Sequence, residues 1–124
     1  MSPRNTILSL LLILVTGSAL AAGYDVQRFQ SFMSLNAAQK EKDMSYLIGV
    51  SRGLILASMY MEQQYESRLF CIPRNQFSEA YGAAIPALNS EIASPSGGHP
   101  YSPDTPMEVV MLQALKTHYP CNIN

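Results

Sequence analysis

The chain of 124 residues contains two cysteines, Cys71 in Phe70-Cys71-Ile72-Pro73 and Cys121 in Tyr119-Pro120-Cys121. An export signal precedes both, and exported proteins meet an oxidising compartment in which disulfides form and persist. We therefore expect one disulfide between Cys71 and Cys121. This bond would close a loop of about 50 residues and stabilise the fold by about 4 kcal/mol, a large part of the roughly 5 to 15 kcal/mol that keeps a typical domain folded.

Residues 1–22 have the three parts of a signal peptide. Arg4 lies near the amino terminus, residues 7–15 form an apolar run, and Ala19-Leu20-Ala21 supplies the small residues of a cleavage site. A retained membrane anchor and a buried first helix are the alternatives, but the apolar run is too short to span a bilayer. We expect cleavage near residue 22 and release of the mature chain into the periplasm, where no membrane contact remains.

A reactive cysteine is the alternative to the disulfide. A catalytic cysteine could use His118 or His99 as its base, and His118 with Cys121 could bind a metal. A lone His-x-x-Cys pair lacks the four ligands that a structural zinc needs, and a nucleophilic cysteine needs a third, orienting group. We therefore expect no catalytic residue, no metal and no cofactor, and we predict that the protein is not an enzyme.

The composition indicates one small domain without a basic surface. Removal of Arg4 with the signal peptide leaves seven Lys and Arg against nine Asp and Glu, a net charge of −2. This balance gives no basic field for nucleic acid. Apolar residues are plentiful and tryptophan is absent, which is typical of a single domain with a modest core. Residues 23–124 are therefore predicted to form one domain.

Helical spacing of apolar residues predominates along this domain, and no segment alternates as a strand would. A short first helix is expected over residues 26–33. Asn36 followed by Gln39 resembles a capping box and predicts the start of a long helix that runs to about Ser67. Its expected apolar face consists of Met44, Leu47, Ile48, Ile55, Met59 and Met61.

Two further helices follow Pro73. The third pattern begins near Asn75 and continues to Ile92, with Pro86 inside it, so that we expect a kink or two short helices. For the last helix, Thr105 is the expected cap and Pro106 the first helical residue, and Pro120 follows its end. The predicted fold class is all-α, a small bundle of four helices, or of five short ones, braced by one disulfide.

A ridge of small side chains lies within the long helix, where Gly49, Gly53 and Ala57 follow one another at intervals of four. Such a ridge lets another backbone approach closely. The stretch from Met44 to Met61 could also be taken for a transmembrane helix, but Arg52 in its middle makes insertion costly. We expect a buried core helix, with the ridge used for packing within the chain or between two copies.

The loop of residues 94–104 is rich in Pro, Gly and Ser and is longer than the usual connection in a helical bundle. One interpretation is a solvated linker. The other is a binding loop, in which three prolines limit the entropy lost on docking. In the second interpretation His99, Tyr101 and Asp104 are the predicted partner-binding residues.

Several motifs resemble those of the Rap/Tai family of type VI secretion immunity proteins. They are the segment from Tyr46 to Gly53, with the pattern Tyr-x-x-Gly-x-x-x-Gly, then Cys71-Ile72-Pro73, then the amphipathic third helix with Leu88, then the segment from Ala114 to Cys121. The resemblance covers about residues 44 to 121. The motifs are short, and their order, their spacing and the export signal together carry the likeness.

The resemblance implies a periplasmic all-helical protein that can form a homodimer. It also implies that the protein binds a cognate effector, a peptidoglycan amidase delivered by neighbouring cells, and blocks its active site. Such an inhibitor needs no catalytic residue. Two features depart from the family as a whole: Met44 and Ser45 stand where many members carry another cysteine, and the 94–104 loop is long.

Two other functions remain open. One is a periplasmic acid chaperone resembling HdeA, which is also small, helical and held by one disulfide. That activity requires release of apolar surface at low pH, and the mature chain has nine carboxylates and two histidines to drive it. The other is an exported helical binding protein with a different role, because one scaffold can carry several functions.

Overall fold

The computed structural model describes residues 23–122, so that the predicted signal peptide, residues 1–22, lies outside the described part, as do residues 123–124. Within the described part the protein is all-α, with four α-helices and no strand, which confirms the predicted fold class. In chain order the elements are α2 (Val26–Gln30), the 3-10 turn η1 (Phe32–Ser34), α3 (Ala37–Tyr65), the 3-10 turn η2 (Arg74–Gln76), α4 (Phe77–Ala93) and α5 (Met107–His118).

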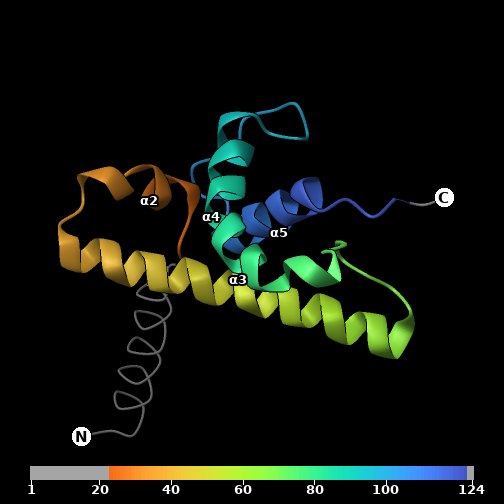
Figure 1. Cartoon of the computed structure of the whole chain (residues 1–124). Coiled ribbons are helices and arrows are strands. Elements are labelled where there is room, and N and C mark those ends of the chain that lie inside the picture. Colours follow the sequence, from red (N-terminus) through yellow and green to blue (C-terminus); the bar gives the residue numbers. More distant parts are fainter. Residues whose placement is uncertain (1–22, 123–124) are drawn as a thin grey trace, which may run out of the picture.

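The long helix α3 is the base on which the other elements lie (Figure 1). It begins where the sequence predicts, because the Asn36 side chain accepts a hydrogen bond of 2.9 Å from the backbone N–H of Gln39. It ends at Glu66, which has a left-handed backbone with φ of 52° and donates its N–H to the carbonyl of Glu62. A left-handed residue commonly closes an α-helix in this way.

Only one face of α3 is buried. Its buried residues recur every three or four positions: Asp43, Leu47, Ser51, Ile55 and Ser58. The predicted apolar face is therefore right at Leu47 and Ile55 but wrong at Met59, which is 37% exposed. Among the described residues α3 is also the one helix long and apolar enough to cross a membrane, a test that core helices of soluble proteins also pass. The expected buried core helix is seen along this face only, because 22% of that apolar stretch is buried.

The small-residue ridge lies on the solvent side of α3. Gly49, Gly53 and Ala57 are exposed, and no neighbouring atom lies within 4 Å of the position that a Cβ would take at either glycine. Packing of this ridge within the chain was therefore a wrong expectation. Its use between two copies of the chain stays a prediction.

Helices α4 and α5 pack against each other and against α3. Pro86 lies inside α4, which is one continuous helix, and in Figure 1 its ribbon changes direction between its green first turns and its later, bluer turns. Of the two expectations for Pro86, the bend within one helix is the one seen. A proline inside a helix removes one backbone hydrogen bond and crowds the preceding turn.

The start of α5 differs from the prediction. Pro106 occupies the cap position and no side chain caps the helix, so the expected Thr105 cap is wrong. The physical reason is that the Thr105 backbone is already used, because its carbonyl accepts a hydrogen bond of 3.1 Å from the N–H of Val26 and its N–H donates to Ser102. Helical spacing predicts one face of α5 from Met107, Met111, Ala114, Leu115 and His118. The first four are buried, whereas His118 is exposed and was wrongly placed on this face.

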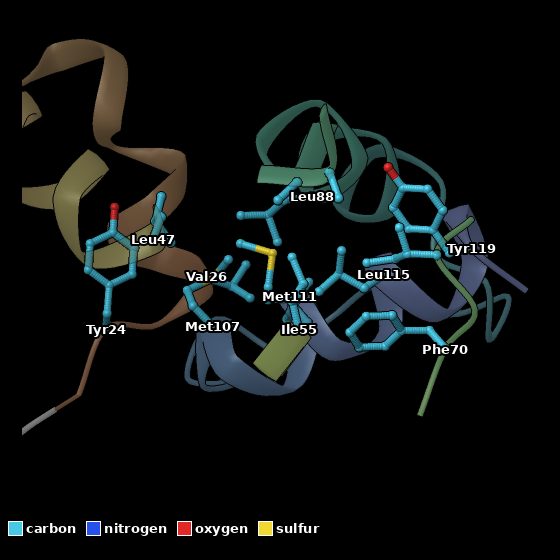
Figure 2. Close-up of a cluster of buried hydrophobic side chains, with 14 residues drawn as sticks. Tyr24, Val26, Leu47, Ile55, Phe70, Leu88, Met107, Met111, Leu115 and Tyr119 are labelled. Atoms are coloured by element: carbon cyan, nitrogen blue, oxygen red, sulfur yellow. The ribbon is translucent and has the colours of Figure 1, made fainter. Parts of the chain in front are cut away.

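One core joins all these elements. Ile55 of α3 and Met111 of α5 lie together near the centre of the cluster, with Leu88 of α4 on one side (Figure 2). All three side chains are fully buried. Burial of such side chains contributes about 1.5 to 3 kcal/mol each before the entropy of ordering is subtracted.

The predicted disulfide is present. Cys71 and Cys121 are bonded with their Cα atoms 4.9 Å apart, and the N–H of Cys71 also donates to the carbonyl of Tyr119 at 2.8 Å. The flanking Phe70 and Tyr119 are buried in the core. Ser58 of α3 donates its hydroxyl to the Phe70 carbonyl at 3.2 Å. The bond thus joins the segment after α3 to the segment after α5 at a site where both already touch the core.

Removal of this bond by the double substitution Cys71→Ser and Cys121→Ser is expected to lower the free energy of unfolding by about 4 kcal/mol, because a crosslink across about 50 residues restricts the unfolded chain. Urea unfolding followed by circular dichroism measures the change, with the reduced wild-type protein as the control. Equal unfolding midpoints for the bonded and the unbonded protein would contradict the structural role of the disulfide.

Candidate functional site

The loop of residues 94–104 is tied to a buried carboxylate at its start. Glu91, in the last turn of α4, is only 3% exposed. Its Oε1 atom accepts hydrogen bonds from the Ser96 N–H at 3.0 Å, from the Ser96 hydroxyl at 2.8 Å and from the Tyr101 hydroxyl at 2.6 Å. Gln113 of α5 donates to the same Ser96 hydroxyl at 2.9 Å. One acidic side chain therefore holds two separate points of the loop.

These hydrogen bonds keep Glu91 ionised. Burial raises the pKa of the Glu91 carboxyl, but donation from Tyr101 and Ser96 outweighs burial, and the pKa lies below its ordinary value. Burial and the nearby Glu91 charge raise the pKa of the Tyr101 hydroxyl. At neutral pH the pair is thus a charged acceptor and a neutral donor, and hydrogen bonds to charged groups are the stronger kind.

The other end of the loop is tied to residues 24–27. Gln27 donates its N–H to the Pro103 carbonyl at 2.9 Å, and Val26 donates to Thr105 at 3.1 Å. The N–H of Met107 in turn donates to the carbonyl of Tyr24 at 2.9 Å. These backbone bonds fix where the loop ends and where α5 begins.

The segment of residues 24–28 is itself anchored to α3 through a second buried carboxylate. Asp43 is 1% exposed and pairs with Arg28 at 2.9 Å. The Arg28 guanidinium lies over the Tyr24 ring, which stacks on Tyr46 with ring centroids 5.2 Å apart. Burial raises the pKa of Asp43, but hydrogen bonds from Arg28 and Gln39 outweigh it, so that the pKa is lowered.

Two turns shape the loop between its anchors. The N–H of Gly98 donates to the Pro95 carbonyl at 3.0 Å, and Gly98 has φ of 76°, a left-handed value that favours glycine. A second turn is closed by Thr105 donating to Ser102 at 3.0 Å. The segment His99-Pro100 lies between the two turns and is exposed.

The predicted contact residues all belong to this loop but are not equivalent. His99 and Asp104 are exposed, and Asp104 accepts a hydrogen bond from the Ser102 hydroxyl. Tyr101 is partly buried and its hydroxyl is used by Glu91. A contact role of Tyr101 stays a prediction, and it is restricted to the ring, because the hydroxyl is engaged inside the protein.

The sequence reasoning missed a neighbouring apolar residue. Val109 of α5 is 53% exposed. It lines a shallow hollow of about 350 Å³ together with Gly97, Tyr101 and Gln113. An exposed valine on a helix gives no signal in the sequence by itself. We call the loop and this hollow together the loop surface, defined by residues 96–104 and Val109.

The cysteines are not available for the catalytic and metal-binding roles considered from the sequence. Cys71 and Cys121 are joined to each other, so that neither is a thiolate that His99 or His118 could activate or that a metal could bind. Within residues 23–122, no three His, Cys, Asp or Glu side chains are grouped so that they could hold a metal ion. What the loop offers is a shaped polar surface beside the hollow at Val109.

Comparison with known protein families, with curated proteins and with solved structures finds no match to this chain. The Rap/Tai resemblance therefore depends on the quoted motifs alone.

Replacement of Tyr101 by Phe removes one hydrogen bond to a charged acceptor and is expected to lower the free energy of unfolding by about 1.5 to 3 kcal/mol. The matched control is His99→Ala in the same loop, whose side chain is exposed and should leave the unfolding midpoint unchanged. Chemical unfolding of both variants measures the difference. Equal midpoints for the two variants would show that the anchor is not formed.

Stability is also expected to depend on pH through Glu91. Its folded pKa is depressed, so its contribution is present above the unfolded value of about 4.3 and is lost as the pH falls through the folded value. Wild-type stability should therefore decrease as the pH is lowered from about 5 to 3. Glu91→Gln should be less stable at pH 7 and should show a smaller decrease over the same range, whereas an unchanged slope would contradict the assignment.

Proposed function

We propose that this chain is an exported inhibitor, an immunity protein that binds a cognate peptidoglycan amidase and blocks its active site through the loop surface. The observation that carries the proposal is the anchoring of the exposed 94–104 loop at both ends. Glu91 holds Ser96 and Tyr101 at one end, and Gln27 holds Pro103 at the other. A solvated linker needs no buried charge to hold it.

Anchoring of this kind favours binding for an entropic reason. Ordering a loop on association costs free energy, and a loop that is already ordered avoids most of that cost. The hydrogen bonds that order this loop point inward, toward Glu91. His99 and Asp104 are left on the outside, where they can add polar contacts beside the exposed Val109.

The identity of the partner rests on the family resemblance. The motifs Cys71-Ile72-Pro73 and Tyr119-Pro120-Cys121 meet in space through the disulfide, which agrees with an oxidising compartment such as the periplasm. The target of a periplasmic inhibitor must work in the same compartment, as an amidase of the cell wall does. The exposed apolar residues of α3, Leu56 and Tyr60, are available for the homodimer that the resemblance also implies.

The decisive experiment mixes the mature protein with the secreted amidase encoded beside its gene. We expect a stable complex at micromolar concentrations and loss of hydrolysis of purified peptidoglycan. The loop variant His99→Ala with Asp104→Ala should bind about tenfold more weakly or worse, as truncation of central contacts does. Gln64→Ala, an exposed change on α3, is the matched control and should bind as the wild type does.

Two results would contradict the proposal. Absence of a complex with the neighbouring amidase would exclude the immunity role, and suppression of client aggregation at low pH would then indicate the acid chaperone. If the loop variant and Gln64→Ala bind the amidase with the same affinity, the protein is still an inhibitor, but the loop surface is excluded as its contact.

A further inference from the structure

A second feature of Glu91 is independent of the amidase. The ion pairs among the described residues are Arg28 with Asp43 and Arg68 with Glu62, so that Glu91 has no cationic partner there. Its hydrogen-bond donors, Ser96, Tyr101 and Thr117, are neutral groups. Buried charges in proteins are normally paired with an opposite charge or with a metal. A carboxylate that is 97% removed from solvent and lacks a counter-ion is therefore unusual.

This carboxylate lines an open pocket between α4 and α5. The pocket has a volume of about 230 Å³, with Ser90, Glu91 and Ser94 on one wall and Ala114, Thr117 and His118 on the other. The volume is several times the ~30 Å³ that one water molecule occupies in the liquid. Small side chains and hydroxyl groups make up most of the lining, so a compact ligand with hydrogen-bond donors fits there.

The helix ends around the pocket have the same electrostatic sign as Glu91. α4 ends at Ala93 and α5 ends at His118, and the pocket is lined by residues from the last turns of both. The carboxyl end of a helix carries partial negative charge because its last carbonyl groups lack helical partners. Two such ends and one buried carboxylate therefore favour a positive ligand at this place.

We propose that the pocket between α4 and α5 binds a small cation with N–H donors, an ammonium or a guanidinium group, and that Glu91 is its counter-ion. The Glu91 carboxylate supplies the charge, and the hydroxyl groups of Ser90 and Thr117 supply further acceptors. The cation can be the head of a free small amine or the side chain of a Lys or Arg residue of a protein partner. The pocket adjoins the loop anchor, so that occupancy would act on the same carboxylate that holds Tyr101.

The test uses mature protein purified from the periplasm and three probes with the same butyl chain, of which the guanidinium and the urea also have head groups of matching shape. n-Butylguanidinium and n-butylammonium carry the charge, and n-butylurea is the neutral control. In a two-dimensional amide NMR titration at pH 7.5, the two cations should give saturable shifts at residues 87–94 and 114–118 with a Kd of roughly 1 to 10 mM. n-Butylurea should give none.

Two variants separate the pocket from the fold. Glu91→Gln should weaken binding about tenfold or more, since one unit charge is lost from a buried site. Ser90→Leu fills the mouth of the pocket from an exposed helix position and should abolish binding while the Ser96 amide signal stays in place. If Glu91→Gln fails to fold, the loss or retention of cation binding in Ser90→Leu tests the pocket by itself.

The source of the cation is distinguished by a second pair of probes. N-Acetyl-arginine N-methylamide mimics an arginine within a chain, and free arginine is its counterpart. Tighter binding of N-acetyl-arginine N-methylamide would identify the ligand as an arginine side chain of a partner. Tighter binding of free arginine would identify it as a free small molecule. The proposal is overturned if butylurea binds as well as the cations do, if Ser90→Leu binds undiminished, or if no cation binds.

Discussion

The Cys71–Cys121 disulfide is the constraint on which the remaining architecture depends. It joins the segment that leaves α3 to the segment that leaves α5, and the residues beside it, Phe70 and Tyr119, belong to the core. Because α4 and α5 lie between the two cysteines in the chain, the bond encloses the helices that carry the loop. A core of about a hundred residues without tryptophan has limited area to bury, and a crosslink adds stability without adding area.

Two buried carboxylates position segments on this crosslinked frame. Asp43 holds residues 24–28 against α3 through Arg28, and Glu91 holds the loop against the end of α4. At both carboxylates the hydrogen bonds outweigh the effect of burial, since the pKa of each lies below its ordinary value, and each group favours one defined arrangement of the segment that it holds. In this chain each carboxylate fixes one of the two segments that meet beside Pro103. The loop surface is thus a consequence of local electrostatics on a crosslinked helical frame.

Much of the frame was predictable because its signals are local. The Asn36 cap, the buried face of α5 and the disulfide each follow from residue type and spacing. The orientation of α3 was not predictable, because its exposed face also carries large apolar side chains such as Leu56 and Tyr60. Glu91 was overlooked although a signal exists, since it lies three residues after Leu88 on the apolar stripe of α4. The Thr105 cap failed because a distant backbone partner, Val26, was invisible to local reasoning.

The central claim is that the exposed 94–104 loop is held as ordered structure by an inward hydrogen-bond network. Amide order parameters from NMR relaxation of the unbound mature protein test it most directly, because they need neither a partner nor a variant. We predict values for Ser96, Gly98 and Tyr101 near those of the helices, about 0.85. Values below about 0.6 across the loop would indicate a flexible linker and would contradict the claim.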